Sequence, residues 1–492
     1  MRLLAALSLS VTAIAASLVS AETRNFRDFP RNFQHVVIIV QENRTPDNLF
    51  QGLCAPPYGS AESCNAAPRR GQYDIQTADW LDDSAPSGIT QPLTVELANN
   101  YDLKHAHAAF VEMCNVDSPG GHCRMNGAAG IVCGGTCPTQ PQFRFVGNAS
   151  GILDPYLTLA RQYGWANYMF QTNQGPSFPA HQFLFGGTSA PSAFDDAVGI
   201  FAADNPGEAN AGCAAPAGSV TALINPSGLE NQFLYPCYER VTLPDLLPPG
   251  ITWRYYAATP LTQTPTTTQQ IVNSIWTAPD AISHICQSTG PGGTCAGSDF
   301  TEHVDLVSAD VLRDIGNCRL ASLTWVTPTA ANSDHGFIND GGGPSWVASI
   351  VNAIGNSSRC DGNRGYWSNT AILITWDDWG GWYDHEPPTI LPGPQGDYQY
   401  GFRVPFLFVS AYTPSGYINN ARYDFGSILR FVERNFGIPE GALYFADARA
   451  HNDLREFFDL RAKPRAFRTI AAPKDASFFL NDKRPQGAPD DD

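Results

Sequence analysis

The fold is decided by the stretch Ala371-Ile-Leu-Ile-Thr-Trp-Asp-Asp-Trp-Gly-Gly-Trp-Tyr-Asp-His385 of this 492-residue chain. Its first part, residues 371–375, is a continuous run of apolar and β-branched residues, typical of a strand buried on both faces of a parallel sheet. Asp377 and Asp378 follow at once, and carboxylates beside a buried strand need a cation, hydrogen-bond donors or water. The pattern therefore predicts an α/β sheet with a charged site at the carboxyl end of this strand.

Further ionisable groups follow the same strand. Gly380 and Gly381 permit positive φ or a close approach of the backbone, which would fold Asp384 and His385 back towards the same site. The alternative is a strand followed by a solvated turn and an exposed Asp-His pair. The segment alone favours neither interpretation.

Length and composition limit the number of domains and indicate a mildly acidic surface. A chain of this length can form two or three domains, or one large domain with insertions. Charged residues make up only 16% of the chain and the formal net charge is -17. Because there is no basic stripe, we expect neither nucleic acid nor an anionic membrane as a partner, whereas a zwitterionic headgroup is compatible.

The first 21 residues have the pattern of a secretory signal peptide. Arg2 precedes an apolar run from Leu3 to Leu18, and Val19-Ser-Ala21 forms a small-residue cleavage site. The run is short for a membrane-spanning helix, and no later stretch is long and apolar enough for one. The sequence thus predicts a secreted or periplasmic protein that begins at Glu22 after cleavage and has no stable membrane insertion.

Twelve cysteines, an even number, favour disulfides in an exported chain. Proximity in the sequence suggests the pairs Cys54 with Cys64, Cys213 with Cys237, Cys286 with Cys295 and Cys318 with Cys360. The remaining cysteines, which are left to pair among themselves, are Cys114, Cys123, Cys133 and Cys137. The last two also have the spacing of half a zinc site, but no matching pair of His or Cys stands at the spacing of a zinc ribbon.

Strands alternate with helices along the chain, which predicts a central, mostly parallel sheet flanked by helices. The predicted strands are 33–40, 165–170, 320–327, 371–376 and 404–410, and the predicted helices are 152–164 and 425–436. Residues from about 188 to 315 are rich in Ala, Pro, Thr and Gly, which indicates a disulfide-braced insertion or cap over the sheet. We expect a single domain over 22–460 that includes this insertion, followed by a polar tail over 461–492.

Polar residues also follow other predicted elements. Glu42 and Asn43, after the first strand, offer one charged and one neutral oxygen, as divalent cation sites do, although helix capping is the alternative. Ser177 lies at a helix start, where free N–H groups favour a phosphate, but a serine there can equally be a plain cap. His105 and His335 each have an acidic neighbour. In a chain with ten histidines, neither indicates catalysis by itself.

Five segments, in this order, resemble the signature of the bacterial-type phospholipase C and acid phosphatase family. They are His35-Val-Val-Ile-Ile-Val-Gln-Glu-Asn-Arg44, Gly175-Pro-Ser177, Ser333-Asp-His335, Trp376-Asp-Asp-Trp-Gly-Gly-Trp-Tyr-Asp-His385-Glu-Pro-Pro and Gly401-Phe-Arg-Val-Pro405. The resemblance extends from about 33 to 440, with 190–315 largely outside it. That family is similar to alkaline phosphatases in fold, so the resemblance implies a central sheet that carries a metal and a Ser or Thr nucleophile.

The resemblance also implies a role for each matching residue. The implied ligands of one divalent metal ion, zinc or calcium, are Glu42, Asn43, Asp377 and Asp378. Ser177 is the implied nucleophile, and His105 and His335 are expected to contact the phosphoryl group or protonate the leaving oxygen. Asp384 and His385 match the motif and are expected to surround the metal ligands.

The chain also departs from the family pattern. Asp378 replaces a glutamate that is common in many members, which shortens one ligand by a methylene. Phe425 and Ala180 stand where a histidine and an asparagine are common. These departures concern the substrate preference more than the core reaction.

The predicted function is that of a secreted, metal-dependent phosphoesterase that hydrolyses phosphate esters through a phosphoserine intermediate. A phosphomonoesterase of the acid phosphatase type is the first hypothesis, because phosphocholine-cleaving members tend to be longer, with extra C-terminal β domains and a twin-arginine signal. The second hypothesis is a phospholipase C that cleaves phospholipid headgroups. The third is a non-catalytic secreted binding protein on the same scaffold, although the retention of Ser177 and of every proposed ligand argues against it.

Overall fold

The structure, a computed structural model, describes residues 32–116, 122–207, 211–258, 275–389, 398, 400–450 and 452–484. The predicted signal peptide, residues 1–21, lies outside the described residues. Within the described ranges, no helix combines the length and the apolar character needed to cross a membrane.

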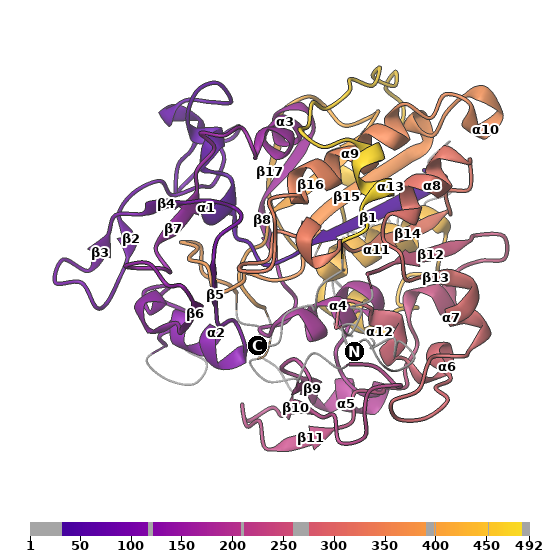
Figure 1. Cartoon of the computed structure of the whole chain (residues 1–492), viewed down its shortest axis with the longest axis horizontal. Helices are drawn as coiled ribbons and strands as arrows, with labels where there is room; N and C mark the ends of the chain where they lie inside the picture. The colour runs from indigo at the N-terminus through magenta and orange to yellow at the C-terminus, as the bar shows by residue number, and fades with distance from the viewer. Residues whose placement is uncertain are drawn as a thin grey trace, which may run out of the picture.

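An eight-stranded sheet forms the centre of the molecule (Figure 1). Its strands, in spatial order, are β13 (Val304–Asp305), β12 (Trp253–Tyr256), β14 (Leu323–Val326), β1 (His35–Gln41), β15 (Thr370–Trp376), β16 (Phe406–Ser410), β8 (Gly164–Phe170) and β17 (Tyr417–Asp424). The strand pairings are parallel except those of β16, which is antiparallel to β15 and β8. The predicted fold class, an α/β fold with a mostly parallel central sheet, is confirmed.

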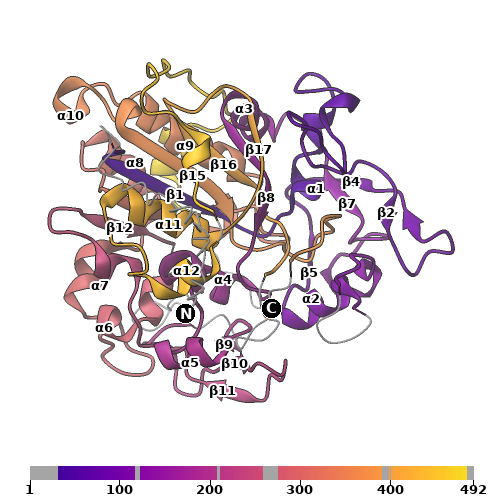
Figure 2. The same ribbon diagram turned by 180° about the vertical axis from the view of Figure 1, so that it is seen from behind.

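Helices cover both faces of this sheet, so its central strands are buried and apolar throughout (Figures 1 and 2). One group of helices in mutual contact comprises α3 (Asp154–Gln162), α8 (Asp310–Gly316), α9 (Gly343–Gly355) and α13 (Ala476–Asn481). A second group comprises α4 (Ser177–Gly186), α11 (Phe425–Phe436) and α12 (Tyr444–Arg449). The predicted helix 425–436 is confirmed at both ends: Asp424 caps its first turn and Gly437, with φ of 75°, ends it.

The chain between β1 and α3 forms a lobe beside the sheet, coloured indigo to purple in Figure 1. Its elements are α1 (Pro46–Leu49), β2 (Trp80–Leu81), β3 (Ile89–Thr90), β4 (Leu93–Val95), β5 (Tyr101–Leu103), α2 (His107–Cys114), β6 (Cys133–Gly135) and β7 (Arg144–Val146). The lobe has an apolar cluster of its own, which includes Trp80 and Phe110. Trp379 and Trp382, from the segment after β15, belong to the same cluster. The lobe therefore packs against the part of the stretch 371–385 that follows β15.

The region from about 188 to 315 differs from the expected insertion. It contains α5 (Ala193–Val198), α6 (Ser283–Cys286), α7 (Ser298–His303) and a separate three-stranded sheet of β9 (Phe201–Ala202), β10 (Thr221–Ile224) and β11 (Gln232–Leu234). However, β12 and β13 from the same region are part of the central sheet. These strands have only four and two residues, too few for a periodic pattern to reveal them. The expectation that the whole region lies over the sheet is corrected accordingly.

All twelve cysteines form disulfides. The four pairs predicted from proximity are confirmed, and the other two are Cys114–Cys123 and Cys133–Cys137. The second of these removes the alternative of a zinc half-site. The longest covalent loop, between Cys318 and Cys360, has a sequence separation of 42.

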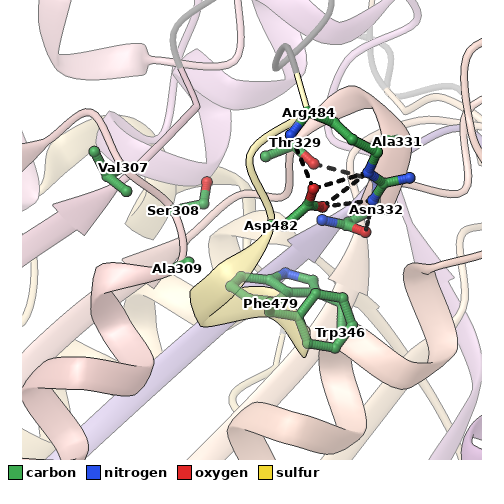
Figure 3. A pocket seen from close by; sticks show the side chains of 10 residues that line it. All are labelled: Val307, Ser308, Ala309, Thr329, Ala331, Asn332, Trp346, Phe479, Asp482 and Arg484. Carbon is green, nitrogen blue, oxygen red and sulfur yellow. Dashed lines mark hydrogen bonds and ion pairs between the residues drawn. The ribbon is translucent and has the colours of Figure 1, made fainter. Parts of the chain in front are cut away.

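The expected polar tail, 461–492, packs against the domain as far as it is described. In α13, Phe479 is 2% exposed and lies edge-on to Trp346 of α9, with ring centroids 5.2 Å apart (Figure 3). Arg484 then donates hydrogen bonds to Asp482 and, over 3.4 Å, to the side-chain oxygen of Asn332. A six-residue helix between polar stretches is too short to give a clear apolar periodicity, which explains why the sequence suggested only a tail.

Two neighbouring phenylalanines test this packing. We expect Phe479→Ala to lower the free energy of unfolding by about 3 kcal/mol, as the removal of buried aromatic side chains does. Phe478, which is 38% exposed, provides the control: Phe478→Ala is expected to cost about 1 kcal/mol or less. Urea unfolding of both variants makes the comparison, and equal losses would show that α13 does not pack as described.

Candidate active site

Four parallel strands deliver the predicted residues to one edge of the sheet. The carboxyl ends of β1, β14, β15 and β8 lie at this edge because these strands share one direction. The residues that follow these ends are Glu42 and Asn43 after β1, His335 after β14, Asp377 and Asp378 after β15, and Ser177 after β8. His105 comes from the lobe, between β5 and α2.

The pairing of β1 with β15 sets the positions of four of these residues. The strands pair without a shift from His35 with Thr370 to Gln41 with Trp376, so positions 42 and 43 stand opposite 377 and 378. Two backbone hydrogen bonds continue the ladder: Asp377 N–H donates to the Gln41 carbonyl over 2.8 Å, and Arg44 N–H to the Asp378 carbonyl over 3.0 Å. Three carboxylates and one amide are thereby held in a small volume.

A close approach of two loops fixes Asn43. Its φ is 61°, a left-handed conformation that asparagine tolerates better than most residues, and its N–H donates to Asp377 Oδ1 over 3.0 Å. Gly380 has φ of 62°, and a Cβ at this position would lie 2.5 Å from both Cβ and the carbonyl oxygen of Asn43. The Gly380 N–H also donates to Asp378 Oδ1 over 2.7 Å. Only a glycine leaves room for Asn43 here.

A histidine that the sequence analysis gave no role faces two of these carboxylates. His181 Nε2 lies 3.4 Å from Glu42 Oε1 and 3.7 Å from Asp377 Oδ2. Burial lowers the pKa of His181 to about 4, despite the opposing effect of Asp377, so the ring is neutral near pH 7. The sequence did contain a signal: His181 stands four residues after Ser177 in a predicted helix, and such residues share one helix face.

His105 orients the amide of Asn43. The His105 Nδ1 atom lies 2.8 Å from the Leu103 carbonyl oxygen, which can only accept, so Nδ1 carries the proton. The other ring nitrogen, Nε2, accepts from Asn43 Nδ2 over 3.0 Å. The amide oxygen of Asn43 is thus turned away from the imidazole. It makes no hydrogen bond with the residues that the structure describes.

Ser177 and Asp378 are in contact. The Ser177 Oγ–H donates to Asp378 Oδ2 over 3.3 Å, and the same oxygen lies 3.9 Å from His105 Nε2. Ser177 is the first residue of α4 and Pro176 is its N-cap, which excludes the alternative that Ser177 is a plain N-cap. The hydroxyl therefore lies between the helix N-terminus and the carboxylates.

His335 lies beside His105, with ring centroids 5.9 Å apart. Its Nδ1 is 2.7 Å from the Gly336 carbonyl oxygen, which assigns the proton to Nδ1 as in His105. The loop that carries it is held through the buried Asp334, whose Oδ2 accepts from Tyr156 over 2.8 Å and from Trp376 over 2.9 Å. Burial raises the pKa of Asp334 to about 6, although these hydrogen bonds oppose the shift.

The donor set fits a divalent cation. Glu42, Asp377 and Asp378 are all 0% exposed, and three carboxylates so close together and so deep are stabilised by a cation. Asp377 Oδ2 makes no hydrogen bond within the described part of the chain, as is also true of the Asn43 amide oxygen. Carboxylate, amide and imidazole groups are ligands of zinc and of other divalent ions.

Asp384 and His385 lie in a second buried cluster. Arg403 contacts Asp384 through two hydrogen bonds, of 2.8 and 3.0 Å, and Asp74 through one of 3.1 Å. His385 Nδ1 is 2.7 Å from Asp47 Oδ2, and Nε2 is 3.0 Å from Asp74 Oδ1. Both residues of the motif thus support the segment after β15, and among the described residues their side-chain ion pairs run to this cluster instead of to Glu42, Asp377 or Asp378.

Charge in this cluster predicts a pH dependence of stability. Burial disfavours the charged His385 ring, but the contacts with Asp47 and Asp74 outweigh burial and raise its pKa from 6.5 to about 10. A raised pKa in the folded chain stabilises it fully below pH 6.5, and the stabilisation is lost as the pH rises to 10.

We therefore expect the free energy of unfolding to fall from pH 6.5 to pH 10 with a slope of up to about 1.4 kcal/mol per pH unit. His385→Gln should remove this part of the slope, whereas the exposed His122→Gln should keep it. Denaturant unfolding at a series of pH values measures both, and identical slopes would contradict the assigned charge.

Gly380 provides a test of the loop contact. We expect Gly380→Ala to displace Asn43 and to weaken the binding of added zinc roughly tenfold or more, as the loss of supporting contacts around metal ligands does. Gly437→Ala is the matched control, because Gly437 also has positive φ, 75°, but has no atom within 4 Å of an added Cβ. The control should lose about 1 to 2 kcal/mol of stability and keep its metal affinity. Equal metal affinities in the two variants would contradict the contact.

Comparison with known proteins finds relatives of low sequence identity. The Phospholipase C B of Mycobacterium tuberculosis is 28% identical over 177 residues, which is 32% of this chain and 32% of that protein. The Phospholipase C A of the same organism is 23% identical, and the alignment covers 83% of this chain and 74% of that protein. A solved protein in the alkaline phosphatase superfamily from Vibrio parahaemolyticus has 11% identity and a TM-score of 0.29, covering 58% of this chain and 61% of that one. The first of these alignments spans about a third of the relative.

A sequence model of one family matches almost the whole described domain. The match extends over residues 33–439 and includes the proposed nucleophile and every proposed ligand. The sheet, the strand-end carboxylates and the serine at the start of α4 all lie within it. The chain therefore belongs to the Phosphoesterase family.

Proposed function

We propose that the chain is a metal-dependent phosphoesterase that hydrolyses phosphate esters through a phosphoserine intermediate. The observation that supports this most directly is the 3.3 Å hydrogen bond from Ser177 to Asp378, which puts a hydroxyl beside a cluster of carboxylates. The proposed ligands of one divalent ion are Glu42, Asn43, Asp377 and Asp378. Such an ion, when bound, supplies positive charge that lowers the pKa of a nearby hydroxyl and attracts the phosphate.

The side chains around Ser177 suit the first half of the reaction. Ser177 Oγ forms a bond to phosphorus while the bond from phosphorus to the leaving oxygen breaks. The proton of Oγ leaves along its hydrogen bond to Asp378 Oδ2, which is 3.9 Å from His105 Nε2. In the first turn of α4, Pro179 has no N–H and the Phe178 N–H donates to Asn205 Oδ1 over 2.8 Å, so we assign the contact with the phosphoryl oxygens to the Ser177 N–H and the positive end of the helix dipole.

The two histidines take different parts in the reaction. Both hold a proton on Nδ1 through a backbone carbonyl, so Nε2 is the nitrogen that can accept a proton in each neutral ring. His105 Nε2 accepts from Asn43 Nδ2, so we assign to His105 the orientation of this amide beside the phosphoryl group. We assign to His335, when it carries a proton on both nitrogens, the protonation of the leaving oxygen. The neutral ring of His335 then takes a proton from the water that hydrolyses the phosphoserine, and Asp378 returns its proton to Ser177 Oγ.

For the substrate, we propose a small phosphomonoester, as an acid phosphatase would take. Ser177, His105 and His335 are 0%, 0% and 2% exposed, which suits a small ester that enters a narrow site. A phospholipase C is the second candidate, because a relative named Phospholipase C A aligns with 83% of this chain. The contact of a hydroxyl, a carboxylate and an imidazole argues against a non-catalytic binding protein.

Export is part of the proposal. Six disulfides brace the described chain, and disulfides persist in oxidising compartments such as the periplasm and the extracellular space. The pattern of residues 1–21 gives the same indication.

The removal of the nucleophile and of the metal tests the mechanism. We expect Ser177→Ala to lower kcat on an aryl phosphate by roughly four powers of ten, since the nucleophile and its activating groups act as a unit. The exposed Ser87→Ala is the control and should keep full activity. Chelation should abolish turnover and added zinc should restore it. Mass spectrometry of acid-quenched wild type should find phosphate on Ser177.

Each part of the proposal has its own contrary result. Turnover by Ser177→Ala would contradict the assignment of Ser177 as the nucleophile. Full activity after chelation would contradict the metal dependence. Parallel assays on an aryl phosphate and on phosphatidylcholine vesicles decide between the substrates. Hydrolysis of the lipid alone would favour the phospholipase C.

A further inference from the structure

We infer that His181 is a ligand of the metal ion and that its imidazole makes the site prefer zinc or another transition ion over calcium. This inference rests on the proposed function, because it concerns the same metal. It adds a nitrogen ligand to a set that otherwise contains only oxygen atoms. The preference of the site for one metal then depends on α4, the helix that also carries Ser177.

The first step is the position of His181 on α4. Ser177 and His181 are four residues apart, so both side chains lie on one face of the helix, one turn apart. All ten residues of this helix are buried, and His181 is 1% exposed. One rigid element can therefore present a nucleophile and a metal ligand to the same place.

The second step is the distance between the potential ligand atoms. His181 Nε2 is 3.4 Å from Glu42 Oε1 and 3.7 Å from Asp377 Oδ2, and one ligand atom from each of the three residues lies within 4.8 Å of the others. In a tetrahedral zinc site with bonds of about 2.05 Å, neighbouring ligand atoms are about 3.3 Å apart. The two distances from His181 Nε2 thus come close to the spacing that a shared ion requires.

The third step excludes a simple ion pair. A charged imidazole that donates to a carboxylate lies about 2.7 to 2.9 Å from the oxygen. His385 shows this arrangement in the same chain, with distances of 2.7 and 3.0 Å to Asp47 and Asp74. The His181 distances are clearly longer, and neither of its ring nitrogens makes a hydrogen bond with any described residue. Distances of 3.4 and 3.7 Å are instead close to those between neighbouring atoms that ligate one ion.

The chemistry of the ligands gives the consequence for selectivity. Calcium and magnesium prefer oxygen ligands, whereas imidazole favours zinc and its neighbours in the transition series. Carboxylate and amide oxygens alone would admit either class. With His181, the proposed set becomes one nitrogen and several oxygen atoms, which shifts the preference towards zinc.

The variant His181→Gln tests this assignment, with the exposed His122→Gln as control. Both proteins and the wild type are prepared metal-free, and zinc and calcium affinities are measured by competition with chromophoric chelators. We expect His181→Gln to bind zinc roughly 100-fold more weakly, and to change calcium affinity by less than about threefold. The control should match the wild type for both ions.

Two spectroscopic measurements make the result independent of activity. The visible absorption of the cobalt-loaded wild type should change in His181→Gln, and X-ray absorption of the zinc-loaded proteins should show one imidazole fewer in the variant. If His181→Gln does not fold, the zinc-loaded wild type decides: a site without imidazole scattering overturns the inference.

Different results would overturn the role of His181 and the proposed phosphoesterase function. Unchanged zinc affinity and an unchanged cobalt spectrum in His181→Gln would overturn the role of His181 and leave the phosphoesterase intact. A wild type that is fully active without any metal would instead overturn the proposed function.

Discussion

The parallel pairing of β1 with β15 is the constraint on which the site depends. Neither strand carries a catalytic group, yet their unshifted register puts Glu42 and Asn43 opposite Asp377 and Asp378. A slip of one residue would turn every side chain to the other face of the sheet, because strands alternate with a period of two. The buried apolar side chains of both strands fix this register. They therefore also fix the positions of the four polar residues at the strand ends, which are far apart in the sequence.

The segment after β15 is held at three independent points. The Gly380 N–H contacts Asp378, the rings of Trp379 and Trp382 enter the apolar cluster of the lobe, and Asp384 and His385 join the cluster around Arg403. In this cluster the attraction between His385 and its two carboxylates outweighs the cost of desolvation, as the raised pKa of His385 shows. The fixed geometry of these pairs also keeps the segment rigid beside the site.

The features that were predicted correctly from the sequence are those that depend on a pattern of neighbouring residues. The central strands and the carboxylates at their ends were recognisable because apolar runs stop abruptly at charged residues. The contact between Ser177 and Asp378 was expected only from the resemblance, since the two residues are 201 positions apart in the chain. Spacing along one strand or helix carries no information about such a long-range contact.

The failures of the sequence analysis have physical causes as well. β12 and β13 are too short to show a period, and α13 gains its order from a neighbouring helix instead of from its own sequence. The resemblance implied that Asp384 and His385 surround the metal ligands, whereas their side chains bond to Asp47, Asp74 and Arg403. Arg403, which holds Asp384, was noted only as part of a motif, because a lone arginine does not reveal its partners.

The disulfides have a consequence for how the chain matures. Every cysteine is bonded to the next or the previous one along the sequence, and no two covalent loops overlap. When such a chain emerges with its N-terminus first, each cysteine meets its native partner before any wrong one, and one loop is complete before the next begins. Oxidation during translocation would then proceed in sequence order, without the rearrangement of mispaired bonds that interleaved disulfides require.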